Sequence, residues 1–134
     1  MPDRYLFSTR IPVRITDLNY GNHLGNDALL SILHEARVRF LDNYNYTEAN
    51  VEGIGLMMAD VVIIYKYQSF YGDQLTIQIG IDNISKKSCD FYYRITKDKD
   101  KVIALCKTAI VFYDYQSQKP AGIPPQFLKK LVIP

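Results

Sequence analysis

The apolar pattern of the chain changes once, from a helical period to a strand period. Between Asn26 and Asn43 apolar side chains recur every three or four residues, which predicts one long helix with a buried face. From Leu56 onward they recur every second residue, which predicts strands. We therefore expect an α+β fold in which an antiparallel sheet of five strands wraps around one long helix. The apolar helix positions are Ala28, Leu29, Ile32, Leu33, Ala36 and Phe40.

The other side of this helix is polar. We expect Ser31, His34, Arg37 and Asp42 on the polar side, with His34 at the surface.

The strands can also be placed along the chain. Pro12 places the first strand at a sheet edge or a bulge. The predicted strands are Tyr5–Ile15, Met58–Phe70, Gln74–Ile84, Cys89–Lys97 and Val102–Tyr113, and the last four are expected to be joined by hairpins before a short helix at Gln126–Leu131.

Two of these strands are apolar on both faces, at Val61–Ile64 and along Val102–Tyr113. This pattern is typical of strands that are covered on both sides. One helix cannot cover both faces of a five-stranded sheet, so we predict that a second copy of the chain covers the rest. The expected assembly is at least a homodimer.

Length and composition narrow the class of protein. The 134 residues suit a single domain, 1–134. A net charge of +2 argues against nucleic-acid binding, and the apolar runs are too short to span a membrane. No export signal is apparent, which favours a cytoplasmic protein. Cys89 and Cys106 are too few and too far apart for a metal motif or a disulfide framework, so we expect buried reduced thiols.

A polar, glycine-containing loop leads into the helix. It carries Asp17, Asn19 and His23, and it ends at Asn26 and Asp27, which supply a plausible N-cap and an acidic first turn. Such a loop places polar groups beside the free backbone N–H donors of a helix N-terminus. We interpret this loop and the helix start as the functional site of the protein.

Four segments resemble the hot-dog-fold thioesterases, in the 4-hydroxybenzoyl-CoA thioesterase-like branch, which is related to plant acyl-ACP thioesterases. The loop DLNYGNHLGN is similar to the family's Asp-x-Asp…His-Val-Asn-Asn passage. The other segments are HEAR with the following Phe40-Leu41, YQSFYGDQL at Tyr67–Leu75, and FYDYQSQKPAGIP within Ala109–Pro124. The resemblance covers nearly the whole chain and implies a sheet wrapped around a helix. It also implies a homodimer or a homotetramer with acyl-thioester sites at the subunit interface.

The resemblance implies an acyl-CoA thioesterase, which hydrolyses an acyl-CoA to a free acid and CoA without a metal or redox cofactor. One alternative is a hot-dog protein that binds acyl thioesters without hydrolysing them. Another is an acyl-ACP thioesterase. The backbone around Gly25, Asn26 and Asp27 would hold the oxyanion, although these residues also suit ordinary helix capping.

The catalytic base is the open question. The family's usual carboxylate position holds Asn19, which can orient a water molecule but cannot accept a proton as a base. Asp17, two residues earlier, is one substitute, or it caps the loop. His23 matches the histidine of the plant enzymes, or it is a structural histidine. Glu35 resembles the helical carboxylate of a different hot-dog branch, or it pairs with Arg37 or Arg39.

Further side chains could contact the substrate. Tyr20, Met57, Met58 and Tyr65 could line an acyl or aryl slot, although core packing explains them equally well. Lysines at the predicted hairpin ends could bind the 3′-phosphate of CoA, or they could simply be solvated turn lysines. These are Lys86, Lys87, Lys97, Lys99 and Lys101.

Overall fold

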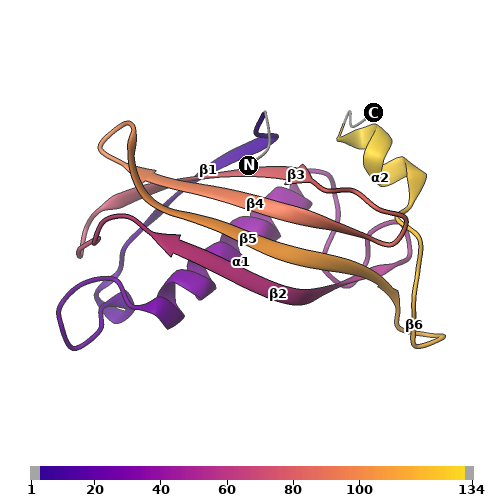
Figure 1. Cartoon of the computed structure of the whole chain (residues 1–134), viewed down its shortest axis with the longest axis horizontal. Helices are drawn as coiled ribbons and strands as arrows, with labels where there is room; N and C mark the ends of the chain where they lie inside the picture. The colour runs from indigo at the N-terminus through magenta and orange to yellow at the C-terminus, as the bar shows by residue number, and fades with distance from the viewer. Residues whose placement is uncertain (1–3, 132–134) are drawn as a thin grey trace.

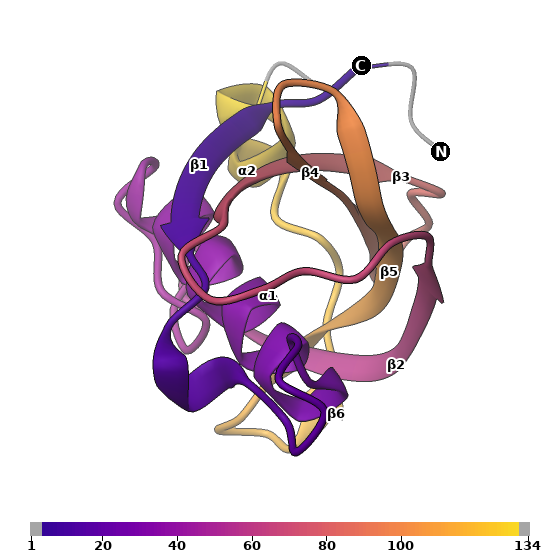
Figure 2. The ribbon, with the colours of Figure 1, turned by 90° about the vertical axis from the view of Figure 1, so that its left-hand side faces the viewer.

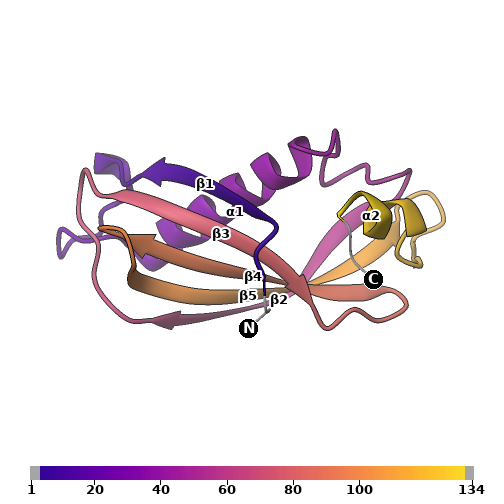
Figure 3. The same cartoon turned by 90° about the horizontal axis from the view of Figure 1, so that it is seen from above.

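A computed structural model of the chain describes residues 4–131. Its one long helix, α1 (Asn26–Asp42), runs along one face of an antiparallel sheet, and the sheet curves around it (Figures 1, 2 and 3). The expected α+β arrangement is confirmed. The strands are β1 (Phe7–Pro12), β2 (Gly55–Tyr65), β3 (Gln74–Asp82), β4 (Ser88–Lys97), β5 (Lys101–Asp114) and β6 (Lys119–Pro120), and the short helix α2 spans Pro125–Lys130.

The strand order in the sheet is β1-β3-β4-β5-β2, with the two-residue β6 paired to β5. The edge position of the first strand and the hairpins β3–β4 and β4–β5 were predicted correctly. The predicted hairpin between the second and third strands was wrong, because β2 pairs with β5 at the far edge. Residues 66–73 therefore cross from one side of the sheet to the other, over the end of the molecule that faces the viewer in Figure 2.

Two strands end well before the predicted residues. The first strand ends at Pro12, because Ile15–Asp17 turns into a short 3-10 helix capped by Arg14. The second strand starts at Gly55 and stops at Tyr65, well before Phe70. Both errors arise at ends where apolar residues continue the alternation but the backbone leaves the ladder for a loop.

The core lies between α1 and the concave face of the sheet. Phe40 has no exposed surface, and its ring packs edge-on against Phe91 of β4, with ring centroids 5.7 Å apart. The helix residues Leu29, Leu33 and Ala36 are also fully or almost fully buried, as the helical period predicts. The strand β5, which lies between β4 and β2, buries one set of alternating side chains and leaves the other set mostly half-buried.

The prediction that Arg37 lies on the exposed polar side of α1 was wrong, because its side chain is only 7% exposed. Its Nε donates to Glu48 Oε2 at 2.8 Å, and its Nη1 donates to the Tyr93 hydroxyl at 3.1 Å. The Tyr93 hydroxyl also bonds the Thr108 hydroxyl at 2.9 Å. A charged side chain can be buried when its partners satisfy it in this way. His34 is exposed, as predicted.

Within residues 4–131, no helix is long and apolar enough to cross a membrane.

Candidate active site

The loop before α1 is closed by its own backbone hydrogen bonds. The Asn19 amide donates to the His23 carbonyl at 2.9 Å, and the Asn22 amide donates to the Asn19 carbonyl at 3.0 Å. Asn22 adopts a left-handed conformation with φ 64°, which asparagine tolerates better than most residues. The Asn19 side chain accepts a hydrogen bond from the Gly21 amide at 2.8 Å. The loop thus has a defined shape that fixes the position of His23.

Asp17 lies beneath this loop and is 4% exposed. Its carboxylate accepts hydrogen bonds from the Arg14 backbone amide at 2.8 Å and from the Arg14 guanidinium at 3.0 and 3.2 Å. Burial raises the pKa of this carboxyl, but the hydrogen bonds and charge of Arg14 lower it more, so the pKa lies below its ordinary value. Asp17 is therefore an ionised side chain engaged by a cation, and its backbone carbonyl accepts from the Gly25 amide at 3.0 Å.

The N-terminus of α1 offers free donors. Gly25 occupies the N-cap and brings no side-chain cap. A Cβ there would lie 3.0 Å from Asp27 Oδ1 and 3.4 Å from the Asn19 Cβ, so glycine permits this close approach. Among residues 4–131, no group accepts a hydrogen bond from the Asn26 or Asp27 amide, whereas the Ala28 amide donates to Asp27 Oδ1 at 2.9 Å. Two neighbouring amides thus remain available in the positive field of the helix.

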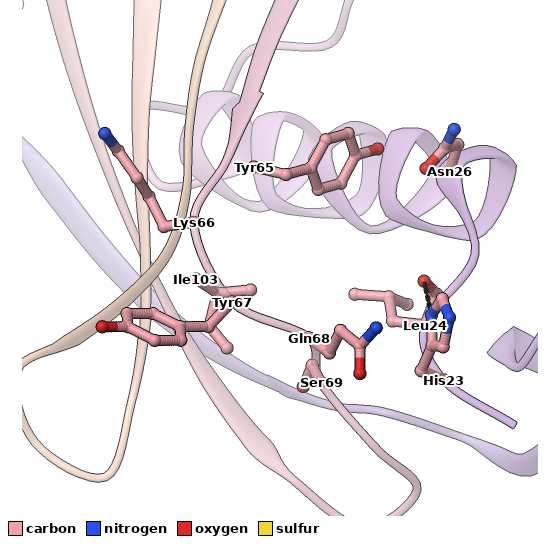
Figure 4. A pocket seen from close by; sticks show the side chains of 9 residues that line it. All are labelled: His23, Leu24, Asn26, Tyr65, Lys66, Tyr67, Gln68, Ser69 and Ile103. Atoms are coloured by element: carbon pink, nitrogen blue, oxygen red, sulfur yellow. Dashed lines mark hydrogen bonds between the residues drawn. The ribbon is translucent and has the colours of Figure 1, made fainter.

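A cavity of about 270 Å³ opens beside Asn26, at the start of α1. Its walls come from the loop before α1, from the end of β2 and from the segment that crosses to β3. In Figure 4 the rings of His23 and Tyr65 and the side chain of Gln68 lie around it, and Asn26 marks the start of the helix. The Leu24 amide donates to the Ser69 carbonyl at 2.8 Å, which ties the crossing segment to the helix entrance. The lining residues are His23, Leu24, Asn26, Tyr65, Lys66, Tyr67, Gln68, Ser69 and Ile103.

His23 is the titratable residue of the predicted catalytic set that lines this cavity. Its Nδ1 lies 3.4 Å from the Leu24 carbonyl, a long contact that favours the tautomer with the proton on Nδ1 (Figure 4). No residue of the described chain is hydrogen-bonded to Nε2. In that tautomer Nε2 carries a free lone pair and can accept a proton.

The other predicted catalytic residues lie elsewhere. Glu35 is 52% exposed and pairs with Arg39 at 2.8 Å, which is the structural alternative considered for it. Asn19 shapes the loop next to Gly25 and does not line the cavity. Asp27 is exposed at the first turn of α1, with one carboxylate oxygen bonded to the Ala28 amide.

The predicted substrate residues are brought together only in part. Tyr65 lines the cavity with His23, whereas the Tyr20 side chain is fully exposed. Met57 and Met58 lie seven or more residues before Tyr65 on β2, which is roughly 20 Å along a strand. Met58 lines a different cavity, of about 250 Å³, together with Arg37 and Thr108.

The crossing segment is the part of the site that the sequence did not predict. Gln68 and Ser69 were placed inside a continuous strand, so their approach to His23 was missed. The signal in the sequence is weak, because Lys66–Phe70 keeps the β-rich composition of the preceding strand. Within residues 4–131, no cluster of three or more His, Cys, Asp or Glu side chains is arranged to hold a metal ion.

Comparisons with known proteins agree with this architecture. The sequence model of the thioesterase-like superfamily matches residues 13–131. No curated protein matches the sequence significantly. Three similar solved structures illustrate the likeness in fold.

YbaW, a probable thioesterase from Escherichia coli, is 25% identical with a TM-score of 0.78, covering 92% of this chain and 95% of its own. Slr0204, a 1,4-dihydroxy-2-naphthoyl-CoA thioesterase from Synechocystis, is 19% identical with a TM-score of 0.83, covering 94% and 95%. The DHNA-CoA thioesterase from Staphylococcus aureus is 16% identical with a TM-score of 0.80, covering 93% and 87%.

Proposed function

We propose that this chain, which belongs to the thioesterase-like superfamily, hydrolyses an acyl-CoA thioester to a free acid and CoA. The observation that carries the proposal is that Asn26, the first residue of α1 with an unbonded backbone amide, lines one cavity together with the His23 ring. The neighbouring Asp27 amide is also unbonded within the described residues. Thioester hydrolysis needs oxyanion donors and a base for water. These groups supply both.

The proposed reaction places the thioester carbonyl oxygen at the Asn26 and Asp27 amides. Water attacks the carbonyl carbon while His23 Nε2 takes its proton, and the negative charge moves to the carbonyl oxygen. The tetrahedral intermediate then collapses and the carbon–sulfur bond breaks. The leaving CoA thiolate receives the proton from the His23 imidazolium, so the histidine returns to its starting form.

Asp17 and Asn19 have positioning roles in this proposal. The Asp17 carboxylate is already bound by Arg14, and its lowered pKa makes it a weak base. Asn19 is neutral and holds the loop through Gly21. Glu35 stands in its own ion pair with Arg39. The base is therefore assigned to His23.

We further propose that two copies pair through the free edge of β2. This edge strand has eleven residues and exposes apolar side chains, including Val61, Val62 and Ile64. A long apolar edge without protection would invite uncontrolled pairing with other strands. A second copy would complete the sheet across the edge and cover these side chains.

We also propose a cytoplasmic location for the protein, where Cys89 and Cys106 would remain thiols.

Asn19 favours a second candidate function, which is acyl-thioester binding without hydrolysis. A site without the family's usual carboxylate could keep its oxyanion donors and its cavity and yet lack turnover. An acyl-ACP thioesterase differs from the main proposal only in the carrier of the acyl group. Release of free thiol would distinguish a thioesterase from a protein that only binds acyl thioesters. Turnover of the same acyl group on CoA and on ACP would distinguish an acyl-CoA thioesterase from an acyl-ACP thioesterase.

The deciding experiment measures thiol release from a panel of aliphatic and aromatic acyl-CoAs, with wild type, His23→Ala and His34→Ala. His34 is the matched control, because it is exposed and bonds Glu48 at 2.6 Å, away from the cavity. We expect turnover on at least one class, a fall in kcat of roughly 10²- to 10⁴-fold for His23→Ala, and little change for His34→Ala. Saturable binding without turnover would instead support the non-hydrolytic function.

A further inference from the structure

Tyr65, the last residue of β2, reaches the candidate active site from the sheet. Its cross-strand partner, Ala104 of β5, is completely buried, so both residues lie on the face of the sheet that packs toward α1. The Tyr65 side chain is nevertheless 46% exposed, and it lines the same cavity as His23 and Asn26. It therefore forms the wall of the cavity opposite the helix start.

The Tyr65 hydroxyl is a polar group that the fold does not use. Within residues 4–131, nothing is hydrogen-bonded to it. The Tyr93 hydroxyl, by contrast, bonds the Thr108 hydroxyl at 2.9 Å. The Tyr46 hydroxyl donates to the Glu52 carboxylate at 2.6 Å. Tyr65 thus keeps a free donor at the cavity.

Figure 4 shows where this hydroxyl points. The Tyr65 ring extends from β2 toward the start of α1, and its oxygen is directed toward Asn26. The backbone amide of Asn26 also has no acceptor within the described residues. Two residues with unbonded donors, one on the sheet and one on the helix, therefore line the same cavity.

An oxyanion site gains from donors on more than one side. The Asp27 amide is the other candidate donor of the helix, but Asp27 does not line this cavity. A carbonyl oxygen has two lone pairs, and the negative charge that it acquires in a tetrahedral intermediate is stabilised by several converging donors. A hydroxyl that approaches from the sheet can supply a donor that the helix alone does not place in the cavity.

We propose that the Tyr65 hydroxyl donates a hydrogen bond to the thioester carbonyl oxygen, and that this bond strengthens as negative charge develops there. The proposal rests on the proposed function, since the carbonyl belongs to the acyl thioester. The hydroxyl keeps its proton throughout, while His23 moves the proton of the attacking water. Burial, and after it the neighbouring Cys106, raises the pKa of Tyr65 above its ordinary value, so the neutral donor is present at neutral pH.

A simpler role for Tyr65 is to line the acyl slot with its ring, as the sequence suggests. Phenylalanine separates the two roles, because it keeps the ring and removes only the hydroxyl. The slot wall would be preserved in Tyr65→Phe, whereas the donor would be lost. The variant should fold as wild type does, since the hydroxyl makes no hydrogen bond within residues 4–131.

The first test compares thioester hydrolysis by wild type, Tyr65→Phe and Tyr113→Phe. Tyr113 is the matched control, because its hydroxyl also makes no hydrogen bond within the described chain and it lies opposite Gly55, at the other end of β2. We expect Tyr65→Phe to lower kcat roughly 10- to 10²-fold and to change KM less than about twofold, because the backbone donors remain. Tyr113→Phe should keep the wild-type kcat. Equal kcat and equal Tm in wild type and Tyr65→Phe would overturn the proposal and leave Tyr65 as a wall of the slot.

A second substrate distinguishes the carbonyl oxygen from the leaving sulfur as the acceptor of this hydrogen bond. Thiophenol is a more acidic thiol than CoA, so a thiophenyl ester needs less help when its carbon–sulfur bond breaks. If the hydroxyl serves the carbonyl oxygen, Tyr65→Phe should slow the CoA and thiophenyl esters by a similar factor. A loss that disappears with the thiophenyl ester would assign the hydroxyl to the sulfur and overturn the proposal.

A measurement without turnover keeps the proposal separate from hydrolysis. In a dethia analogue of an acyl-CoA, a methylene group replaces the thioester sulfur, so the carbonyl can bind but cannot be hydrolysed. Infrared difference spectra with an isotope-labelled carbonyl should show a lowered stretching frequency on binding to wild type and to Tyr113→Phe, and a smaller lowering with Tyr65→Phe. If this pattern holds but no thioester is hydrolysed, the role of the hydroxyl stands and the proposed function fails. If all three proteins lower the frequency equally while wild type hydrolyses thioesters, the proposed function stands and the role of the hydroxyl is wrong.

Discussion

The Asn26 backbone amide is the smallest group on which the proposed chemistry depends. It occupies the first position of α1, and its N–H has no acceptor within the described residues. An unbonded amide at this position can hold a developing oxyanion without any rearrangement. Because the donor belongs to the backbone, substitutions that change only the side chain leave it in place.

Proline at this position removes the donor and leaves the helix start intact. Proline suits the first position of a helix, and Gly25 before it already has the extended conformation that proline requires, with φ −82° and ψ 160°. We expect Asn26→Pro to lower kcat roughly 10²- to 10³-fold. Asn26→Ala, which keeps the amide, should retain most of the activity.

Thermal unfolding of both variants is the control for this prediction. Similar Tm values would show that the helix start is preserved in Asn26→Pro. Full thioesterase activity in a folded Asn26→Pro protein would remove this amide from the oxyanion site.

Asp17 is a second residue whose role can be isolated, because its carboxylate is buried and bound by Arg14. Its folded-state pKa lies below the ordinary value, so its contribution to stability is present at neutral pH and is lost as the pH falls through the folded pKa. We expect Asp17→Asn to lower the free energy of unfolding by about 1–2 kcal/mol at pH 7. The difference from wild type should shrink in acid.

Urea unfolding at several pH values measures this difference. Asp42→Asn is the matched control, because Asp42 is exposed at the end of α1, and it should change stability much less. A stable Asp17→Asn protein that has lost its activity would instead make Asp17 a catalytic carboxylate.

At the scale of elements, α1 is fastened to the sheet by a polar cluster as well as by its apolar face. Arg37 of α1 bonds Tyr93 of β4, which bonds Thr108 of β5, and the same guanidinium bonds Glu48 after the helix. Burial raises the pKa of Glu48, but the contacts with Arg37 and His34 lower it more. The cluster fixes the rotation of the helix relative to two strands.

Removal of Arg37 should therefore be costly. Arg37→Met leaves the half-buried Glu48 carboxylate and the buried Tyr93 hydroxyl without their main partner. We expect the free energy of unfolding at pH 7 to fall by roughly 2–3 kcal/mol. Because the folded-state pKa of Glu48 is lowered, the Glu48 contribution is lost in acid, and the deficit of Arg37→Met should narrow there.

Chemical denaturation at neutral and acid pH checks this prediction. Lys107→Met, which breaks the exposed pair between Lys107 and Asp60, is the comparison and should have a much smaller effect. Equal effects of the two variants would mean that the buried cluster contributes no more than a surface ion pair.

The segment from residue 66 to residue 73 forms one wall of the candidate active site. It carries Gln68 and Ser69 to the entrance of α1, where the Leu24 amide bonds the Ser69 carbonyl at 2.8 Å. Lys97 holds the other side through Gln68 and Asp73. A hairpin between β2 and β3 would have left the cavity beside His23 without one of its walls.

At the scale of the whole molecule, the sheet ends in two different edges. β1 is short, with Pro12 at its end, and such an edge discourages further pairing. β2 is eleven residues long and apolar. This asymmetry supports an assembly in which two copies meet at β2 and leave β1 outside.

Val62→Glu tests the proposed pairing of two copies. Val62 is 48% exposed and lies opposite Lys107 of β5, so a glutamate is tolerated within one copy but brings like charges together in a pair. We expect wild type to have twice the 15.5 kDa chain mass in light scattering, and Val62→Glu to shift toward the monomer. Ile84→Glu, at an exposed position outside β2, should not shift.

A monomeric wild-type protein would contradict the proposed pairing. A dimer that is insensitive to Val62→Glu would place the interface on another surface.

The sequence by itself determined the elements of this protein, the polar entrance of its helix and its apolar helix face. These are local properties, because the period of apolar residues reports which face of an element is buried. His23 and the helix amides at Asn26 and Asp27 were candidates from the sequence as well, because the polar loop and the helix start that carry them are adjacent in the chain.

Only the tertiary structure decided which strands pair and which side chains meet. Every strand presents the same backbone donors and acceptors, so the place of β2 beside β5 depends on contacts that are distant in the sequence. Because of that pairing, the chain must cross the end of the sheet to reach β3, and the crossing segment brings Gln68 beside His23 and Lys66 beside Lys101. The burial of Arg37 depended likewise on Glu48 and Tyr93, which lie 11 and 56 residues away along the chain.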